Sequence, residues 1–264
     1  MIFTQRFFAS LILCGMITAC SVLDAPTAEE IPTLPATETP LQTPTIDWFP
    51  ASATPSPEAF VPSTATPEMR PGLGDTTLSD SFTDDSLWDT AASDQGSSSV
   101  EENRLTLAVQ PKIYLISLRH DLSMDNFYAE ITAQPNLCRG EDSYGLLIRA
   151  HAVAYYRFSL TCNGMVSAER IRFNNIQQLH EPIASGDAPI GPPDEVRIGV
   201  WAVGAEMRLF LNGHYQFSIN DASYASGSLG VFARSAGDTP VTVNFSDLMI
   251  QSVTYLAPTR TPMP

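Results

Sequence analysis

The stretch YYRFSLTC, residues 155–162, decides the fold because its side chains alternate between two kinds. Tyr156, Phe158 and Leu160 are large and apolar. They would share one face of a β-strand, because every second side chain of a strand points to the same side. Residues 196–203, VRIGVWAV, alternate in the same way. One apolar face per strand is typical of an antiparallel sheet that packs on a core.

Short apolar segments of this kind recur through residues 76–253, with turn signals between them. Asn163-Gly164 and Asn212-Gly213 favour hairpin turns, because Asn and Gly tolerate positive φ. No window combines a sustained helical period with capping residues. We therefore predict an all-β, antiparallel jelly-roll β-sandwich. The clearest candidate strands are residues 104–109, 112–119, 127–133, 144–149, 155–162, 196–203, 207–211, 215–219, 227–233 and 241–250.

The alternation also separates core side chains from outer ones. The predicted core set is Tyr144, Leu146, Ile148, Tyr156, Phe158, Leu160, Val196, Ile198, Val200 and Ala202. The side chains between them would lie on the outside of one sheet. Five of these outer side chains are aromatic or arginine, namely Arg149, Tyr155, Arg157, Arg197 and Trp201.

These five side chains form the predicted ligand-binding face. Aromatic planes stack on sugar rings, and arginine guanidinium groups donate paired hydrogen bonds. We therefore expect a site for glycan or another cell-envelope ligand. The alternative is that Tyr155 and Trp201 pack beneath the loop expected at residues 173–195, which contains four prolines.

Several short strand, turn and glycine motifs lie along the same segment. They are LSDSF (78–82), Trp88, NRLTL (103–107), YGLLIRA (144–150), YYRF (155–158), LFLNG (209–213), GSLGVF (227–232) and VNFSDL (243–248). Together they resemble the opening, central hairpin and closing strands of concanavalin A-like jelly-roll domains, in particular the laminin-G-like and keto-disaccharide hydrolase-like branches. The resemblance covers nearly all of residues 76–253. It implies the fold and says little about chemistry, because one fold serves many functions.

The first twenty residues resemble the signal of a bacterial lipoprotein. Arg6 supplies a positive charge, and the apolar run at residues 7–17 is too short to span a bilayer. Ile17-Thr18-Ala19-Cys20 resembles a lipobox, with Ile where Leu is commoner. The resemblance implies that residues 1–19 are removed and that acyl chains on Cys20 hold the protein to the extracytoplasmic face of the cell membrane. The alternative is an ordinary cleaved signal followed by a chance cysteine.

Residues 20–75 differ in composition from the rest of the chain. Eleven of the 21 prolines lie between Pro26 and Pro71, and Thr-Pro pairs recur. Proline removes amide donors and fixes φ, so neither helix nor sheet can run through the segment. We expect a disordered, extended tether. Residues 254–264 share this composition and are expected to be a disordered tail.

Two cysteines remain in the predicted domain once Cys20 carries lipid. Cys138 and Cys162 flank the predicted hairpin of residues 144–161. An exported protein meets an oxidising compartment, which favours a disulfide between them. Two free buried thiols are the alternative.

The charge and the histidines limit the range of partners. The formal net charge of −15 disfavours nucleic acid as a partner, because phosphates are repelled. The four histidines are scattered, with no pair at metal-ligand spacing. No cofactor is signalled beyond a structural calcium, which Asp80 and Asp247 could share because they lie in the first and last strands. Solvated carboxylates are the alternative at both positions.

Catalytic motifs are weak in this sequence. It has no Gly-x-Ser-x-Gly elbow, and Glu-x-Asp-x-x-Glu does not occur. Glu169 and Glu206 stand as single strand carboxylates, for which we expect solvation or pairing with arginine. The sequence therefore predicts a surface-tethered β-sandwich binding module. A glycoside hydrolase-like enzyme and a purely structural or adhesion unit are the alternatives. The sequence gives neither the ligand nor the oligomeric state.

Overall fold

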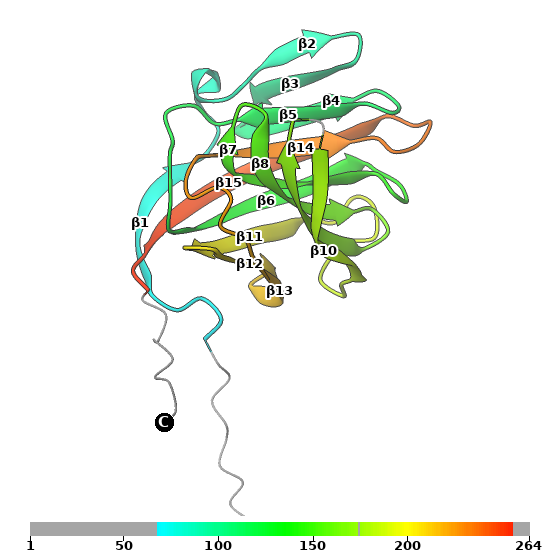
Figure 1. Ribbon diagram of the computed structural model, residues 1–264. Coiled ribbons are helices and arrows are strands. Elements are labelled where there is room, and N and C mark those ends of the chain that lie inside the picture. The colour runs from blue at the N-terminus through cyan, green and yellow to red at the C-terminus, as the bar shows by residue number, and fades with distance from the viewer. Residues whose placement is uncertain (1–67, 174, 256–264) are drawn as a thin grey trace, which may run out of the picture. The chain divides into compact units, whose positions relative to one another are not determined.

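Two antiparallel sheets make up the part of the chain that the structure, a computed structural model, describes: residues 68–173 and 175–255. Figure 1 labels strands of the two sheets. Each sheet contributes one apolar face to the core between them. The predicted signal peptide, Cys20 with its predicted lipid, and most of the predicted tether and tail lie outside the described residues.

The large sheet has nine strands in the order β13-β12-β11-β6-β15-β4-β3-β2, with β1 also paired to β15. The first and last strands along the sequence, β1 and β15, are neighbours in this sheet, and Asp80 lies opposite Leu248. The bounds are β1 Leu73–Asp80, β2 Ala91–Ser93, β3 Gly96–Glu101, β4 Arg104–Val109, β6 Phe127–Leu137, β11 Val196–Val203, β12 Glu206–Leu211, β13 His214–Asn220 and β15 Val241–Val253.

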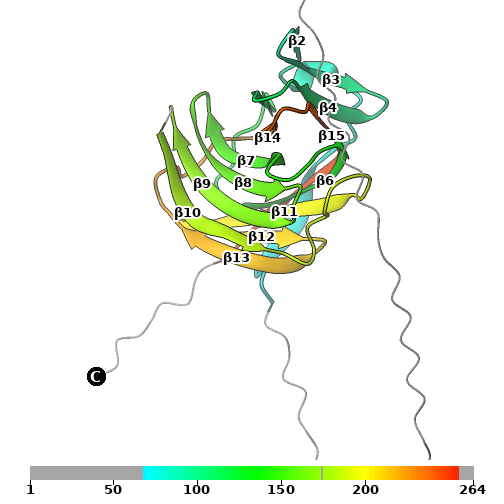
Figure 2. The same cartoon turned by 90° about the vertical axis from the view of Figure 1, so that its right-hand side faces the viewer.

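The small sheet has six strands in the order β10-β9-β8-β7-β14-β5. Figure 2 shows β7, β8, β9 and β10 side by side as a curved layer. The bounds are β5 Tyr114–Leu118, β7 Ser143–His151, β8 Ala154–Thr161, β9 Met165–Arg172, β10 Asn175–Ala184 and β14 Ser228–Arg234.

The all-β prediction is confirmed, and so is the predicted core. All ten predicted core side chains are buried in the cluster between the sheets. The one helical turn of the described residues is a single 3₁₀ turn, Asp85–Leu87. Within those residues no helix has the length and apolar character needed to cross a bilayer. Cys138 and Cys162 form a disulfide with a Cα–Cα distance of 5.8 Å, as the sequence predicted.

Five observed strands, β1, β2, β3, β9 and β10, are not among the candidate strands predicted from the sequence. The segment expected to be a loop at residues 173–195 contains β10, an edge strand paired with β9. Its side chains are mostly exposed, so it lacks the apolar alternation that marks the other strands. Pro182 is tolerated there because an edge strand needs fewer ladder donors. In addition, β1 begins at Leu73, within the segment predicted to be tether.

Candidate functional site

The five predicted ligand-binding side chains do not share one sheet, and this part of the prediction is wrong. Arg149, Tyr155 and Arg157 lie on β7 and β8 of the small sheet. Arg197 and Trp201 lie on β11 of the large sheet. Alternation within a strand shows which side chains share a face, but it does not show which sheet the strand joins.

Trp201 is fully buried on the outer face of the large sheet. Its indole Nε1 donates to the Pro71 carbonyl at 3.1 Å. The Arg208 guanidinium lies 4.6 Å from the ring centroid on which it stacks, and the Tyr255 ring packs edge-on at 5.7 Å. The segment that enters the domain therefore covers Trp201, and a ligand cannot reach it. Arg197 remains at the surface, 3.5 Å from Glu130.

Arg149 is buried and joins three loops. Its guanidinium donates to the carbonyls of Gly204, Tyr224 and Asp125 at 2.7, 3.1 and 2.7 Å. Burial lowers the pKa of this guanidinium. Its Nη1 and Nη2 donate to backbone oxygens and the side chain is 1% exposed, so Arg149 holds these loops together and is not exposed to a ligand.

Tyr155 and Arg157 do line a pocket, which we call the outer-face pocket. It lies on the side of the small sheet that faces away from the core and has a volume of about 450 Å³. Buried Leu147 and Phe232 form an apolar layer on this face. The lining residues are Tyr114, Tyr155, Arg157, Glu169, Ile171, Phe173, Ile176 and Arg234.

An ion pair lies in the middle of the outer-face pocket. Arg157 Nε and Nη2 lie 2.7 and 2.6 Å from Glu169 Oε2, on adjacent strands in direct register. The guanidinium also lies over the rings of Tyr114 and Phe232, at 5.3 and 5.5 Å. Burial alone would lower the pKa of Arg157, but Tyr114 and Glu169 outweigh it and raise the pKa. The Arg157 guanidinium therefore stays charged and is held in place by Glu169.

Two tyrosines lie beside this ion pair. The hydroxyl oxygens of Tyr114 and Tyr155 are 3.2 Å apart. Burial, and then the neighbouring Tyr155, raise the pKa of Tyr114 far above its ordinary value. Tyr114 therefore remains a neutral phenol that can donate and accept hydrogen bonds at physiological pH.

The rim of the pocket is apolar and open on one side. Phe173, in the turn between β9 and β10, is 69% exposed, and Ile176, near the start of β10, is 58% exposed. Large apolar side chains this exposed are candidates for contact with a ligand. Arg234, exposed at the end of β14, closes the opposite side.

Six of the eight lining residues were not predicted from the sequence to bind a ligand. They come from several strands, and the sequence does not show which of these strands pair in the sheet. The Arg157–Glu169 pair depends on the length of a hairpin loop. A two-residue loop at Asn163-Gly164 would place Arg157 opposite Arg170, whereas the observed three-residue loop, 162–164, places it opposite Glu169. Glu206, the other single carboxylate, pairs with Arg208 at 2.8 Å as expected.

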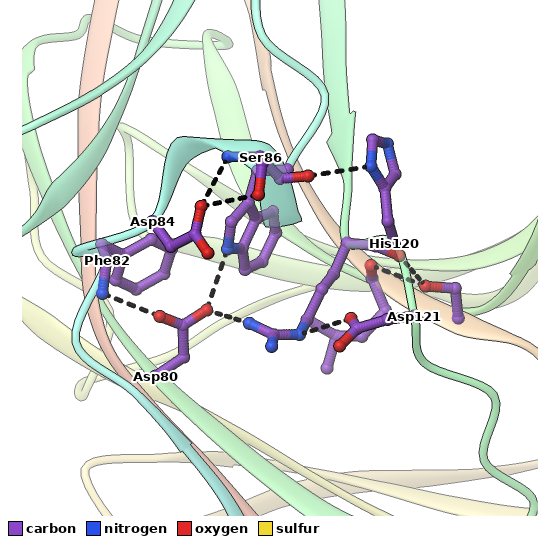
Figure 3. Close-up of polar contacts among 10 residues, drawn as sticks. Asp80, Phe82, Asp84, Ser86, His120 and Asp121 are labelled. Carbon is purple, nitrogen blue, oxygen red and sulfur yellow. Dashed lines mark hydrogen bonds and ion pairs between the residues drawn. The ribbon is translucent and has the colours of Figure 1, made fainter.

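The residues suggested for calcium do not fit a shared ion. Asp80 accepts from the Phe82 amide at 2.8 Å and from the Trp88 indole at 3.0 Å, and it forms a buried ion pair with Arg119 (Figure 3). Both of its oxygens are therefore occupied by protein donors. Asp247 is exposed and accepts from the Ser246 hydroxyl at 2.9 Å. No group of three metal-ligating side chains occurs in the described part of the chain.

A second hollow, the polar pocket, lies on the outer face of the large sheet. Its volume is about 260 Å³. It contains three carboxylates and several amides, but no aromatic side chain. The lining residues are Glu102, Asn103, Arg104, Thr132, Gln134, Glu195, Asn244, Ser246 and Asp247.

No family model and no curated protein sequence matches this chain. Solved structures do match its fold. The carbohydrate-binding module CBM66 from Bacillus subtilis is 14% identical, with a TM-score of 0.53, over 63% of this chain and 96% of that one. A B. subtilis protein of unknown function with a galectin-like fold is 11% identical, with a TM-score of 0.55, over 70% and 99%.

The GH43 protein BlXynB from Bacillus licheniformis is also similar, at 12% identity and a TM-score of 0.52, over 68% of this chain and 40% of that one. At such identities the likeness concerns the backbone, and a shared fold does not imply a shared function. The described domain therefore has a concanavalin A-like β-sandwich fold.

Proposed function

We propose that this chain is a glycan-binding module, exported and held to the cell membrane by lipid on Cys20. The observation that carries the binding function is the outer-face pocket, where the Arg157–Glu169 pair lies between aromatic side chains and an open rim. Such a pocket offers both kinds of contact that a sugar needs.

The pocket offers contacts both for the apolar C–H face of a sugar ring and for its hydroxyl groups. Phe173 at the rim presents an exposed ring on which the apolar C–H face of a sugar can stack. Arg157, Glu169 and the tyrosine hydroxyls supply fixed donors and acceptors for sugar hydroxyls. Because these groups are already held by each other and by the sheet, little side-chain entropy is lost on binding.

The carboxylate content of this pocket favours binding over hydrolysis. Glycosidases generally need two carboxylates that flank the scissile bond. Glu169 is the one carboxylate among the described residues that line the outer-face pocket, and it is paired with Arg157.

A paired substitution tests the binding function. Phe173→Ala removes the exposed ring without opening the core, and Tyr215→Ala removes a partly exposed ring on the large sheet as a control. We expect a glycan array with the full chain in detergent to identify a ligand. Calorimetry should then show about a 30-fold loss of affinity for Phe173→Ala and no loss for Tyr215→Ala. Equal affinities for both variants and the wild type would contradict the proposed site.

The polar pocket favours a second candidate, a glycoside hydrolase. Glu102, Glu195 and Asp247 bring three carboxylates into one hollow, and two are enough for acid–base hydrolysis. If this function is correct, the full chain releases reducing sugar from oligosaccharides and Glu195→Gln abolishes the release. If the chain binds oligosaccharides but releases no reducing sugar, the hydrolase function is contradicted and the binding function remains.

A further inference from the structure

Arg234 gives the outer-face pocket a cationic end. It lies on β14 in register with Tyr114 on β5, and it lines the pocket beside that tyrosine. In the described part of the chain it has no carboxylate within ion-pair distance. Arg157, the other arginine of the pocket, has its charge balanced by Glu169.

The acidic side chain of the pocket is paired with another arginine. Glu169 on β9 forms its ion pair with Arg157 on β8, and the backbones of β9 and β14 are three strand spacings, or about 14 Å, apart. Arg234 is exposed at the end of β14 and forms no ion pair among the described residues. The charge at the β14 end is therefore a local feature, although the chain as a whole carries a net charge of −15.

The apolar end lies on the opposite side. Phe173 and Ile176 belong to the turn before β10 and to β10 itself, four strand spacings from β14, or about 19 Å. A single sugar ring is shorter than this span. A ligand that touches both ends is therefore an oligosaccharide, with one ring against Phe173 and another group beside Arg234.

We infer that the pocket selects acidic oligosaccharides, and that Arg234 binds the carboxylate of a uronic-acid or sialic-acid unit. The planar guanidinium matches a carboxylate with two parallel hydrogen bonds. The inference rests on the proposed glycan-binding function and adds the class of sugar.

A panel of matched oligosaccharides tests it. Each acidic oligosaccharide, uronic or sialic, is paired with the neutral form in which its carboxyl groups have been reduced. Calorimetry measures the affinity of both for the full chain in detergent. Two variants accompany the wild type. Arg234→Gln removes the cation of the pocket, and Arg139→Gln removes an exposed arginine outside the pocket.

We expect acidic members to bind at least about 10-fold more tightly than their neutral forms. Arg234→Gln should remove this preference, so that acidic and neutral forms bind this variant with equal affinity, and Arg139→Gln should keep the preference. Neutral forms that bind as tightly as acidic ones would overturn the inference and leave the glycan function in place. A preference that survives Arg234→Gln would overturn the role of Arg234. If no member of either series binds, the proposed function itself fails.

Discussion

Arg119, directly after β5, and Asp80, at the end of β1, form an ion pair beside the buried ring of Trp88 (Figure 3). Both side chains are about 5% exposed. Two charges taken out of water are tolerated because each satisfies the other and because Asp80 accepts two further hydrogen bonds. Removal of one partner would leave a buried charge without compensation.

We therefore predict that Arg119→Ala lowers the free energy of unfolding by about 3–5 kcal/mol. Urea denaturation of the two proteins measures the change. Arg139→Ala, an exposed arginine, is the control and should stay within about 0.5 kcal/mol of the wild type. A change of similar size in both variants would show that the ion pair has no special role.

Asp221 is a single residue that makes the stability of the fold depend on pH. Burial alone would raise its pKa, but hydrogen bonds from Tyr156 and Ser223 and the charge of Arg170 outweigh it, so the pKa lies below the ordinary 3.8. A lowered pKa stabilises the fold above pH ~3.8, and this contribution is lost as the pH falls through the folded-state pKa. The stability difference between wild type and Asp221→Asn should therefore be largest at neutral pH and shrink below pH ~4. Melting curves from pH 7 to pH 3 that stay parallel would contradict this.

For the secondary-structure elements, the sequence predicts where a strand lies along the chain better than it predicts which strands pair. Residues 196–203 alternate so strictly that β11 was predicted with its observed bounds. The sheet that β11 joins depends on pairing with β6, 63 to 75 residues away in the sequence, and no local pattern encodes this pairing. For the same reason, the prediction placed the five ligand-binding residues on one sheet, whereas they lie on two. Of these five residues, Tyr155 and Arg157 line the pocket, because only they lie on the open face of the small sheet.

The disulfide fastens the end of β6 to the end of β8. It closes a loop between Cys138 and Cys162, which are 24 residues apart in the sequence. By the chain-entropy model a loop of this length stabilises the fold by about 3–4 kcal/mol. The double variant Cys138→Ser/Cys162→Ser should show this loss in urea denaturation, and reduction of the wild type should reproduce it. If neither treatment shifts the midpoint, the bond is absent from the purified protein.

At the scale of the whole domain, both ends of the described chain meet on the outer face of the large sheet. The Met69 carbonyl accepts from Arg208 at 2.7 Å, and the Tyr255 ring packs on Trp201. Figure 1 shows the start of β1 beside the end of β15, where Leu73 pairs with Val253. The outer-face pocket lies on the opposite side of the sandwich from these two ends of the described chain.

The proposed anchor gives a prediction at this scale. Cys20→Ser should release the protein from the membrane fraction or leave it unprocessed, because the cysteine thiol is the acceptor of lipid. Labelling of the producing cells with radioactive palmitate compares the two proteins. Equal label in wild type and Cys20→Ser would contradict lipid attachment at this residue.

We propose that the outer-face pocket of the small sheet binds a glycan. A crystal structure of the chain with the oligosaccharide that binds most tightly on the array tests it most directly. We predict a sugar ring stacked on Phe173, with its hydroxyls hydrogen-bonded to the Arg157–Glu169 pair. A saccharide seated in the polar pocket, or on the large sheet after displacement of residues 69–71, would contradict the account.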